Sequence, residues 1–442
     1  PWRLVSYLRS KGFKADVWDC NVSRSLVIPN LSESDHINRA ALIADAVVKA
    51  IETDVNLKSY QWIGFSILND TLPMTLGVIE RIREKYSDKL LIAGNHEATV
   101  NLQDCFGKSR LNAIIMGDAE ESMEKLLQGL PPHTISGVIW RNWQPKPTRE
   151  QFEHYNECID WASIPYHEYW KRTAALYDWN RMDEKEKLDK QYEINTVRIH
   201  SLVACELACT FCSVTNSRRF ASGSNKPSIV NLSEGALRRN LLAIKSQVPN
   251  VMTIYDSSDE VFLGAGRGMQ YVQILQQVKS VMDDGLPRGM RYLIQCRTND
   301  LYEELIIEAA KAGVKHFTIG VEGGNEKLRK SVIKPQKEDH VRNVIQWCVR
   351  EGIVPYSLLI LFLPEATIQD LYETVTNTRD YMAMGATISV EPFCMSYIGT
   401  NLHESSDYLT EHVTYDIPFT GRPAKKLKWA TLIWPRDQAV CA

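Results

Sequence analysis

The sequence predicts an α/β protein in which an N-terminal doubly wound parallel sheet of the Rossmann type precedes a partial (β/α)6 barrel of the TIM type. Three observations support this fold class. Short apolar strands alternate with amphipathic helices over residues 1–141, a longer alternation fills residues 194–402, and short loops join the elements in both. Such alternation is typical of parallel sheets that are covered by helices. A chain of 442 residues is long enough for two domains with separate cores.

The first unit, residues 1–141, contains the elements of a doubly wound sheet. Each expected strand is a short apolar run, and Gly94 and Gly117 directly follow two of these runs. In such sheets, ligands bind at the carboxyl ends of the strands. The expected strands cover residues 15–19, 60–66, 90–93 and 112–116, and the expected helices cover residues 2–11, 35–51, 72–86 and 120–127.

Residues 142–193 interrupt this pattern. They are rich in Trp, Pro, Tyr and charged residues, and residues 181–190 form a run that is expected to face solvent. We interpret the segment as a linker that crosses between two domains.

The alternation resumes over residues 194–402. Ser233 and Asp300 stand where helices are expected to begin, and Gly313 and Gly352 stand where helices are expected to end. Six strands with five helices between them favour an incomplete β/α barrel, whose active site would lie at the carboxyl ends of the strands. The expected strands cover residues 194–200, 251–256, 290–296, 315–320, 355–361 and 387–393, and the expected helices cover residues 233–247, 269–283, 301–312, 337–351 and 367–384. Residues 403–442 form a C-terminal extension that either helps to bind substrate or belongs to a longer domain.

Cys205, Cys209 and Cys212 have a CxxxCxxC spacing directly after the first barrel strand. Iron–sulfur clusters are usually held by four cysteine thiolates, so three of them would leave one iron with an open coordination position. Two other interpretations are weaker. The three positions share a helical face and could be core residues, and a zinc site would need a fourth ligand, for which His200 is the nearest candidate. We therefore expect an iron–sulfur cluster at the barrel rim.

Composition argues against several classes of function. The formal net charge is −3, from 51 basic and 54 acidic residues, and no basic tract indicates a nucleic acid partner. No apolar run is long enough to span a bilayer, and no signal peptide is visible, although the chain begins at Pro1 and a leader could precede it. Of the ten cysteines, the seven outside the triad are scattered, unlike those of a disulfide framework. We expect a cytoplasmic location, because a reducing compartment protects an oxygen-sensitive cluster.

Five stretches of the sequence, together with the triad and the six βα units, resemble the radical SAM enzymes that carry an N-terminal cobalamin-binding domain. Residues 1–19 resemble the opening of that family, residues 93–99 its GGxHAT loop, and residues 116–122 its GExExT segment. Residues 312–324 are similar to its AGxxxxxxGxESG stretch, and residues 392–402 to its PxPGTxL stretch. The resemblance covers about residues 1–405.

The resemblance implies three cofactors, namely a [4Fe–4S] cluster, S-adenosylmethionine (SAM) and cobalamin. Each cysteine of the triad would bind one iron, SAM would chelate the fourth, and SAM cleavage would give a 5′-deoxyadenosyl radical that abstracts a hydrogen from carbon. The residues implied to contact SAM follow barrel strands and could instead form rim salt bridges; they are Asp256, Asp259, Arg297 and Glu322. The residues implied to hold cobalamin follow strands of the first sheet and could individually be turn residues; they are Ser66, Gly94, Asn95, His96 and Gly117.

The chain also departs from the family pattern. The first strand of the cobalamin-binding domain and its loop are missing, because the chain opens in the first helix, and no DxHxxG motif supplies a histidine below cobalt. His96 is therefore not interpreted as the cobalt ligand. Residues 256–260 stand where the wider superfamily often has Gly-Gly-Glu, and residues 361–364 replace its Gly-Leu-Pro-Gly.

These features favour a cobalamin-dependent methyltransferase that acts on an unactivated carbon of a small molecule or peptide. An external one-electron reductant, such as flavodoxin or ferredoxin, would supply the cluster. The alternative is a radical rearrangement, cyclisation or oxidation in which cobalamin donates no methyl group. A non-catalytic scaffold and a tRNA methylthiotransferase are less favoured, since the triad is intact and no second cysteine-rich domain or basic C-terminal module is present.

Overall fold

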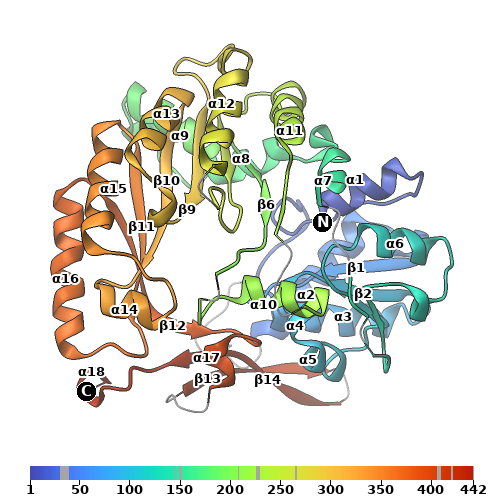
Figure 1. Cartoon of the computed structure of the whole chain (residues 1–442). Helices are drawn as coiled ribbons and strands as arrows, with labels where there is room; N and C mark the ends of the chain where they lie inside the picture. The colour runs from blue at the N-terminus through green and yellow to red at the C-terminus, as the bar shows by residue number, and fades with distance from the viewer. Residues whose placement is uncertain are drawn as a thin grey trace.

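The structure is a computed structural model that describes residues 1–29, 39–144, 146–148, 152–207, 209–224, 229–263, 266–405, 410–419 and 422–441. A four-stranded sheet belongs to the N-terminal part, and an eight-stranded sheet belongs to the remainder. Figure 1 shows the two sheets side by side, with helix α10 (Ser213–Ser222) between them. Within the described residues, no helix combines the length and apolar character needed to cross a membrane.

The N-terminal sheet has the strand order β1 (Trp62–Ser66), β2 (Leu90–Gly94), β3 (Ala113–Ile115) and β4 (Val138–Trp140). The first three strands are parallel, and β4 is antiparallel to β3. Leu91 of β2 packs with α2 (Arg39–Asp54) and α3 (Leu72–Lys85), whereas Ile92 packs with α1 (Trp2–Ser10) and α6 (Glu120–Leu127). Successive strand residues therefore meet helices on opposite faces, and the doubly wound arrangement that the sequence predicts is confirmed.

Two details of this unit differ from the predictions. Residues 15–19 form no strand; polar contacts hold the segment instead, with Asp16 accepting hydrogen bonds from Arg9 and Tyr60, and Trp18 donating one to Asp54. The short antiparallel strand β4 was not predicted. Residues 35–38 of the expected second helix lie outside the described residues, and α2 begins at Arg39.

The segment interpreted as a linker forms three helices, α7 (Phe152–Glu157), α8 (Tyr166–Ala174) and α9 (Glu184–Ile194). Phe152 and Trp170 pack into the core of the barrel, whereas Tyr155 packs into the core of the N-terminal sheet. These helices thus contact both units. The domain boundaries at residues 141, 193 and 402 stay a prediction.

The larger sheet contains the six predicted parallel strands of a partial barrel. In order, they are β5 (Thr196–Ile199), β8 (Thr253–Asp256), β9 (Arg291–Cys296), β10 (Val314–Glu322), β11 (Val354–Phe362) and β12 (Thr387–Ser396). The helices between them cover the outer face in Figure 1; they are α11 (Glu234–Gln247), α12 (Arg267–Asp283), α13 (Glu303–Ala312), α15 (Glu338–Arg350) and α16 (Ile368–Ala383). The predicted partial (β/α)6 barrel is confirmed, and its observed strand and helix ends fall within three residues of the expected ones.

The C-terminal extension adds two strands to the barrel sheet. Strand β14 (Arg422–Ile433) pairs antiparallel with β12, and β13 (Thr410–Phe419) pairs antiparallel with β14. Both strands contact α3, and β13 also contacts α2. Figure 1 shows this hairpin running from the barrel to the N-terminal unit, so the extension joins the two units on the side opposite the linker helices.

Residues of the barrel strands alternate between the helical layer and the inner face. Phe317 and Ile319 of β10 belong to the core beneath the helices, so His316 and Thr318 lie on the opposite face of the strand. The ring of His316 stacks on Tyr356 of β11, and its Nε2 lies 3.1 Å from Thr318 Oγ1. Burial lowers the pKa of His316 to about 4. The inner face therefore holds a histidine that stays neutral near pH 7.

Replacing His316 by Gln should reduce the sensitivity of the protein to acid. The native pKa lies below the ordinary value near 6.5, so the unfolded chain takes up a proton here first and stability is lost as pH falls from about 6.5 towards 4. Between pH 7 and 5, this one group should lower the free energy of unfolding by about 1 to 2 kcal/mol. Chemical denaturation at both pH values measures the effect. An equal fall with pH in the wild type and H316Q would contradict the prediction.

Candidate functional site

The cysteine triad lies on the loop between β6 (Leu202–Val203) and α10. Cys205, Cys209 and Cys212 are half-buried and form no disulfide. The loop follows β5, the first barrel strand, so the thiols stand at the carboxyl ends of the strands, where barrel enzymes place their active sites.

The surroundings of the triad keep its thiols protonated in the metal-free protein. Burial raises the pKa of Cys205 and Cys209 to about 11 and also raises the pKa of Cys212. Thiols bind metals as thiolates, so metal binding here would release protons. Among the described residues, no three His, Cys, Asp or Glu side chains converge as ligands of one metal ion. In an iron–sulfur cluster each cysteine binds its own iron, so the triad need not converge on one point.

Hydrogen bonds from neighbouring segments hold the cysteine loop in place. Ala204 has a left-handed φ of 73°, and its N–H donates to Asp259 Oδ2 at 2.8 Å. The hydroxyl of Thr215 donates to the carbonyl of Leu207 at 3.0 Å. The N–H of Thr210 donates at 3.3 Å to the carbonyl of Val332, which lies in the segment that follows β10. The backbone around the thiols is therefore fixed from several directions.

The two aspartates predicted to contact SAM both have partners inside the protein. Asp256 is buried at the end of β8 and accepts hydrogen bonds from Tyr271 Oη at 2.8 Å and from the N–H of Ser201 at 3.3 Å. Asp259 accepts the hydrogen bond from Ala204. In this structure, both carboxylates support the strand ends and the cysteine loop. Their contact with SAM stays a prediction.

Glu260, which the sequence analysis passed over, is the acidic group at this rim with free hydrogen-bonding capacity. Its side chain is 2% exposed, and its Oε1 has no hydrogen-bond partner among the described residues. Its Oε2 lies 3.3 Å from Nε of Arg297, which also pairs with Asp300 at 2.6 Å. Burial and then Asp300 raise the pKa of Glu260 to about 8. The signal was available, because Glu260 ends the run that stands in place of the family's Gly-Gly-Glu.

Glu322, at the end of β10, forms an ion pair with Lys334. The two groups lie 2.7 Å apart, and their side chains are only 13% and 12% exposed. Glu322 has a left-handed φ of 63°. Burial lowers the pKa of Lys334, but the charge of Glu322 and its hydrogen bond outweigh this effect and raise the pKa. The structure thus brings the predicted residues Arg297 and Glu322 to one rim, together with Glu260 and Lys334, which were not predicted.

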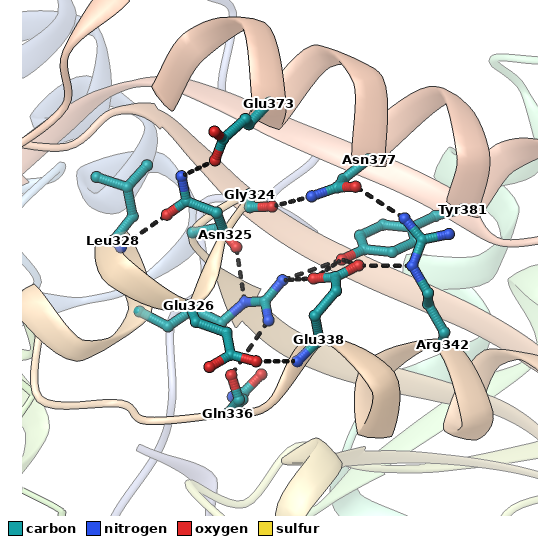
Figure 2. Close-up of polar contacts among 12 residues, drawn as sticks. Gly324, Asn325, Glu326, Leu328, Gln336, Glu338, Arg342, Glu373, Asn377 and Tyr381 are labelled. Atoms are coloured by element: carbon teal, nitrogen blue, oxygen red, sulfur yellow. Dashed lines mark hydrogen bonds and ion pairs between the residues drawn. The ribbon is translucent and has the colours of Figure 1, made fainter. Parts of the chain in front are cut away.

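A buried arginine closes the loop between β10 and α15. Figure 2 shows the polar contacts around Gln336, Glu338 and Tyr381. The guanidinium of Arg329 donates to the carbonyl of Gly323 at 2.9 Å and to the carbonyl of Gln336 at 3.2 Å. The same group donates to Glu338 Oε2 at 2.7 Å and to Tyr381 Oη at 3.0 Å. Since Gly323 and Gln336 stand at the two ends of the loop, Arg329 fixes the path of the residues between them.

Replacing Arg329 by Met should destabilise the protein by about 3 to 5 kcal/mol, because it leaves Glu338 and two carbonyl groups without their buried partner. Arg350 provides the control, since its ion pair with Glu303 is half-exposed on both sides and R350M should change little. Thermal or chemical unfolding of both variants measures the difference. Equal stability of R329M and R350M would contradict this account.

Residues of the N-terminal sheet predicted to hold cobalamin gather at one edge. Ser66 ends β1, Gly94 ends β2, and Gly117 follows β3 with a φ of 64°. Asn95 adopts a φ of 81° and donates from Nδ2 to Ser66 Oγ at 3.0 Å. A Cβ at Gly94 would lie 3.3 Å from the carbonyl oxygen of Ile115, so this position has little room for a side chain.

His96 connects this edge with the cysteine segment. Its Nδ1 lies 2.7 Å from Ser217 Oγ on α10, the helix that follows Cys212. Ser217 Oγ donates to the carbonyl of Val214, so the tautomer assigned from this network has His96 Nδ1 as the donor. Burial lowers the pKa of His96, which favours the neutral ring. This contact supports the interpretation of His96 as a stabilising residue, and its contact with cobalamin stays a prediction.

Comparisons with known proteins find similarity to radical SAM proteins in the barrel sequence and in the overall fold. Residues 199–377 match the sequence model of the Radical SAM superfamily. A sequence search of curated proteins found no match.

Two solved structures of the radical SAM methyltransferase TsrM from Kitasatospora setae are similar to the chain. One, with tryptophan substrate and a SAM analogue bound, has a TM-score of 0.66 and 14% identity over 99% of this chain and 83% of TsrM. The other, with cobalamin and a [4Fe–4S] cluster bound, has a TM-score of 0.63 and 14% identity over 91% of this chain and 73% of TsrM.

The cobalamin-dependent radical SAM enzyme OxsB, with aqua-cobalamin and SAM bound, has a TM-score of 0.57 and 14% identity over 79% of this chain and 49% of OxsB. At this identity the structural likeness concerns the fold, whereas the family match rests on the sequence of the barrel. Both agree with the resemblance that the sequence predicts. Residues 199–377 thus form a radical SAM domain, and the chain is similar in fold to the solved structures of TsrM and OxsB.

Proposed function

We propose that this protein is a cobalamin-dependent radical SAM enzyme that methylates a carbon atom of a small molecule or peptide. The observation that carries the proposal is the position of the cysteine triad, which stands at the barrel rim and is joined to the rim of the N-terminal sheet through Ser217 and His96. The two implied cofactor sites therefore face a common region of the molecule.

The barrel rim has the donor groups that a cluster and SAM require. Cys205, Cys209 and Cys212 would bind three irons and leave the fourth open. SAM carries an ammonium, a carboxylate and a sulfonium group. The unpartnered oxygen of Glu260 suits the ammonium group, and the guanidinium of Arg297 suits the carboxylate. When bound, the cluster and SAM supply a 5′-deoxyadenosyl radical.

The edge of the N-terminal sheet offers polar groups for a corrinoid. Gly94 and Gly117 carry no side chains there, and Asn95 and Ser66 supply polar groups beside them. Cobalamin bound here would supply the methyl group. His96 would hold the edge against α10 through Ser217 and is not the proposed cobalt ligand.

An external one-electron donor, such as flavodoxin or ferredoxin, is the proposed partner, because reductive cleavage of SAM would consume one electron that the cluster has to receive in each turnover. The outcome of the reaction can be distinguished by its products. Formation of 5′-deoxyadenosine together with S-adenosylhomocysteine supports methyl transfer. Formation of 5′-deoxyadenosine without S-adenosylhomocysteine supports a rearrangement, cyclisation or oxidation.

Anaerobic reconstitution tests the proposal directly. The wild type should take up iron, sulfide and one corrinoid, and should form 5′-deoxyadenosine from SAM. Replacing all three triad cysteines by Ala should abolish the visible absorbance of the cluster and the cleavage of SAM. Cys158→Ala is the matched control, because this half-buried free cysteine lies in the linker segment. A triple variant that keeps the cluster, or a wild type that takes up none, would refute the proposal.

A further inference from the structure

We propose that Lys334 is a fixed positive charge beside the cluster-binding cysteines and that it raises the reduction potential of the cluster. The inference rests on the proposed function, since it concerns the same cluster. It assigns a redox role to a residue of the loop between β10 and α15, which supplies none of the proposed iron ligands.

This loop lies against the cysteine loop. The carbonyl of Val332 accepts the hydrogen bond from Thr210, and the carbonyl of Ile333 lies 3.9 Å from Sγ of Cys209. Lys334 is the next residue along the chain. Two consecutive carbonyl groups thus contact the segment between Cys209 and Cys212, and they bring the Lys334 side chain to the same place.

The charges around Lys334 come from three strand ends and the cysteine loop. Glu322 of β10 is its direct partner, and Glu260 beyond β8 and Arg297 beyond β9 lie at the same rim. The cysteine loop adds the Cys209 thiol, whose Sγ lies 3.9 Å from the carbonyl of Ile333, the residue before Lys334. Because both members of the ion pair are largely shielded from water, their charges are less screened than those of surface pairs.

The structure around Lys334 leaves its side chain little freedom. Its N–H donates to the carbonyl of Arg329 at 2.9 Å, and the Arg329 guanidinium fixes both ends of the loop (Figure 2). A Cβ at Gly320 would overlap the Lys334 ammonium group, so the pair with Glu322 packs directly over this glycine.

The residue before Lys334 is held in a strained conformation. Ile333 has a φ of 57°, which β-branched residues rarely adopt, although its side chain is 45% exposed. Such strain persists only where the surroundings determine the conformation, and it is concentrated at functional sites. This conformation allows the Ile333 carbonyl to contact Cys209 and the Lys334 side chain to pair with Glu322.

The direction of the effect follows from charge. Reduction adds one electron to the cluster, so a nearby cation stabilises the reduced form and a nearby anion destabilises it. The potential of iron–sulfur clusters responds to net charge and hydrogen bonds around the sulfur atoms. Removing the charge of Lys334 should therefore lower the potential, and removing the charge of Glu322 should raise it.

The test is a redox titration of the reconstituted full-length protein in the absence of SAM. Dithionite donates electrons through mediators and is oxidised, while each [4Fe–4S]2+ cluster takes up one electron; absorbance and electron paramagnetic resonance follow the reduced form. K334M should have a more negative midpoint potential than the wild type, E322Q a more positive one, and K334R an unchanged one. K330M is the control, because Lys330 is exposed on the same loop and its charge is screened by water.

The outcomes separate the two proposals. A wild type without a cluster refutes the proposed function, and this inference with it. If the wild type binds a cluster, any of three results overturns the inference alone. The midpoint potential of K334M is unchanged, the potentials of K334M and E322Q shift in the same direction, or the potential of K330M shifts as much as that of K334M. If K334M does not retain a cluster, the inference is judged from the other two variants. A more positive midpoint potential in E322Q together with an unchanged potential in K334R supports it, and the absence of a positive shift in E322Q overturns it.

Discussion

The hydrogen bond between His96 and Ser217 joins the two sheet rims on which the proposed chemistry depends. His96 begins the helix that follows β2, and Ser217 lies on α10, directly after the cysteine loop. Each rim is formed by the carboxyl ends of parallel strands, because these ends meet at one edge of a sheet. Neither sheet dictates how it faces the other. The contact between these two helices is one of the connections that supply this relation, and burial lowers the pKa of His96, which favours the neutral ring.

Backbone strain is concentrated next to the triad. Ala204, Glu322 and Ile333 are three of the six non-glycine residues with positive φ among the described residues; Ala204 precedes Cys205, Ile333 contacts Cys209, and Glu322 pairs with Lys334 beside Ile333. Each is held by a specific interaction: the N–H of Ala204 by Asp259, the carboxylate of Glu322 by Lys334, and the carbonyl of Ile333 by Cys209. Fixing the backbone in advance reduces the ordering that cluster binding would otherwise require.

Elements with clear periodicity could be predicted from the sequence, whereas features that depend on distant contacts could not. The six barrel strands and five helices were found because apolar residues recur at fixed spacing and Gly313 marks a helix end. Residues 15–19 have the same local character as a strand. They remain irregular because Asp16 and Trp18 bind polar groups far away in the chain. Strand β4 has only three residues, which is too short for a periodic signal.

The same distinction holds within the candidate site. The triad was predicted because its three residues lie close in sequence. Asp256 and Asp259 were predicted to contact SAM because they follow a strand. Whether their carboxylates are free to bind a ligand depends on hydrogen bonds from Tyr271 and Ala204, and the sequence does not show that these residues lie nearby. Lys334 was overlooked because it follows its strand by twelve residues and returns to the rim through contacts that the sequence does not show, among them those of Arg329 and the ion pair with Glu322.

The fixed relation between the two units has a chemical consequence. A radical formed at the barrel rim reacts with whatever lies nearest, so a methyl donor on another domain is useful only if the distance between the rims is kept constant. Three connections serve this purpose in the described part of the chain: the linker helices, which pack into both cores; the β13–β14 hairpin, which extends the barrel sheet onto α2 and α3; and the contact of His96 with Ser217. The first two act on opposite sides of the interface, and the third acts beside the cysteines. A hinge motion of one unit relative to the other would leave the strand pairings within each sheet intact. It would, however, have to disrupt all three connections at once. The arrangement therefore favours a site in which the substrate enters between two rims with fixed positions. It disfavours a site that forms only when one domain closes onto the other.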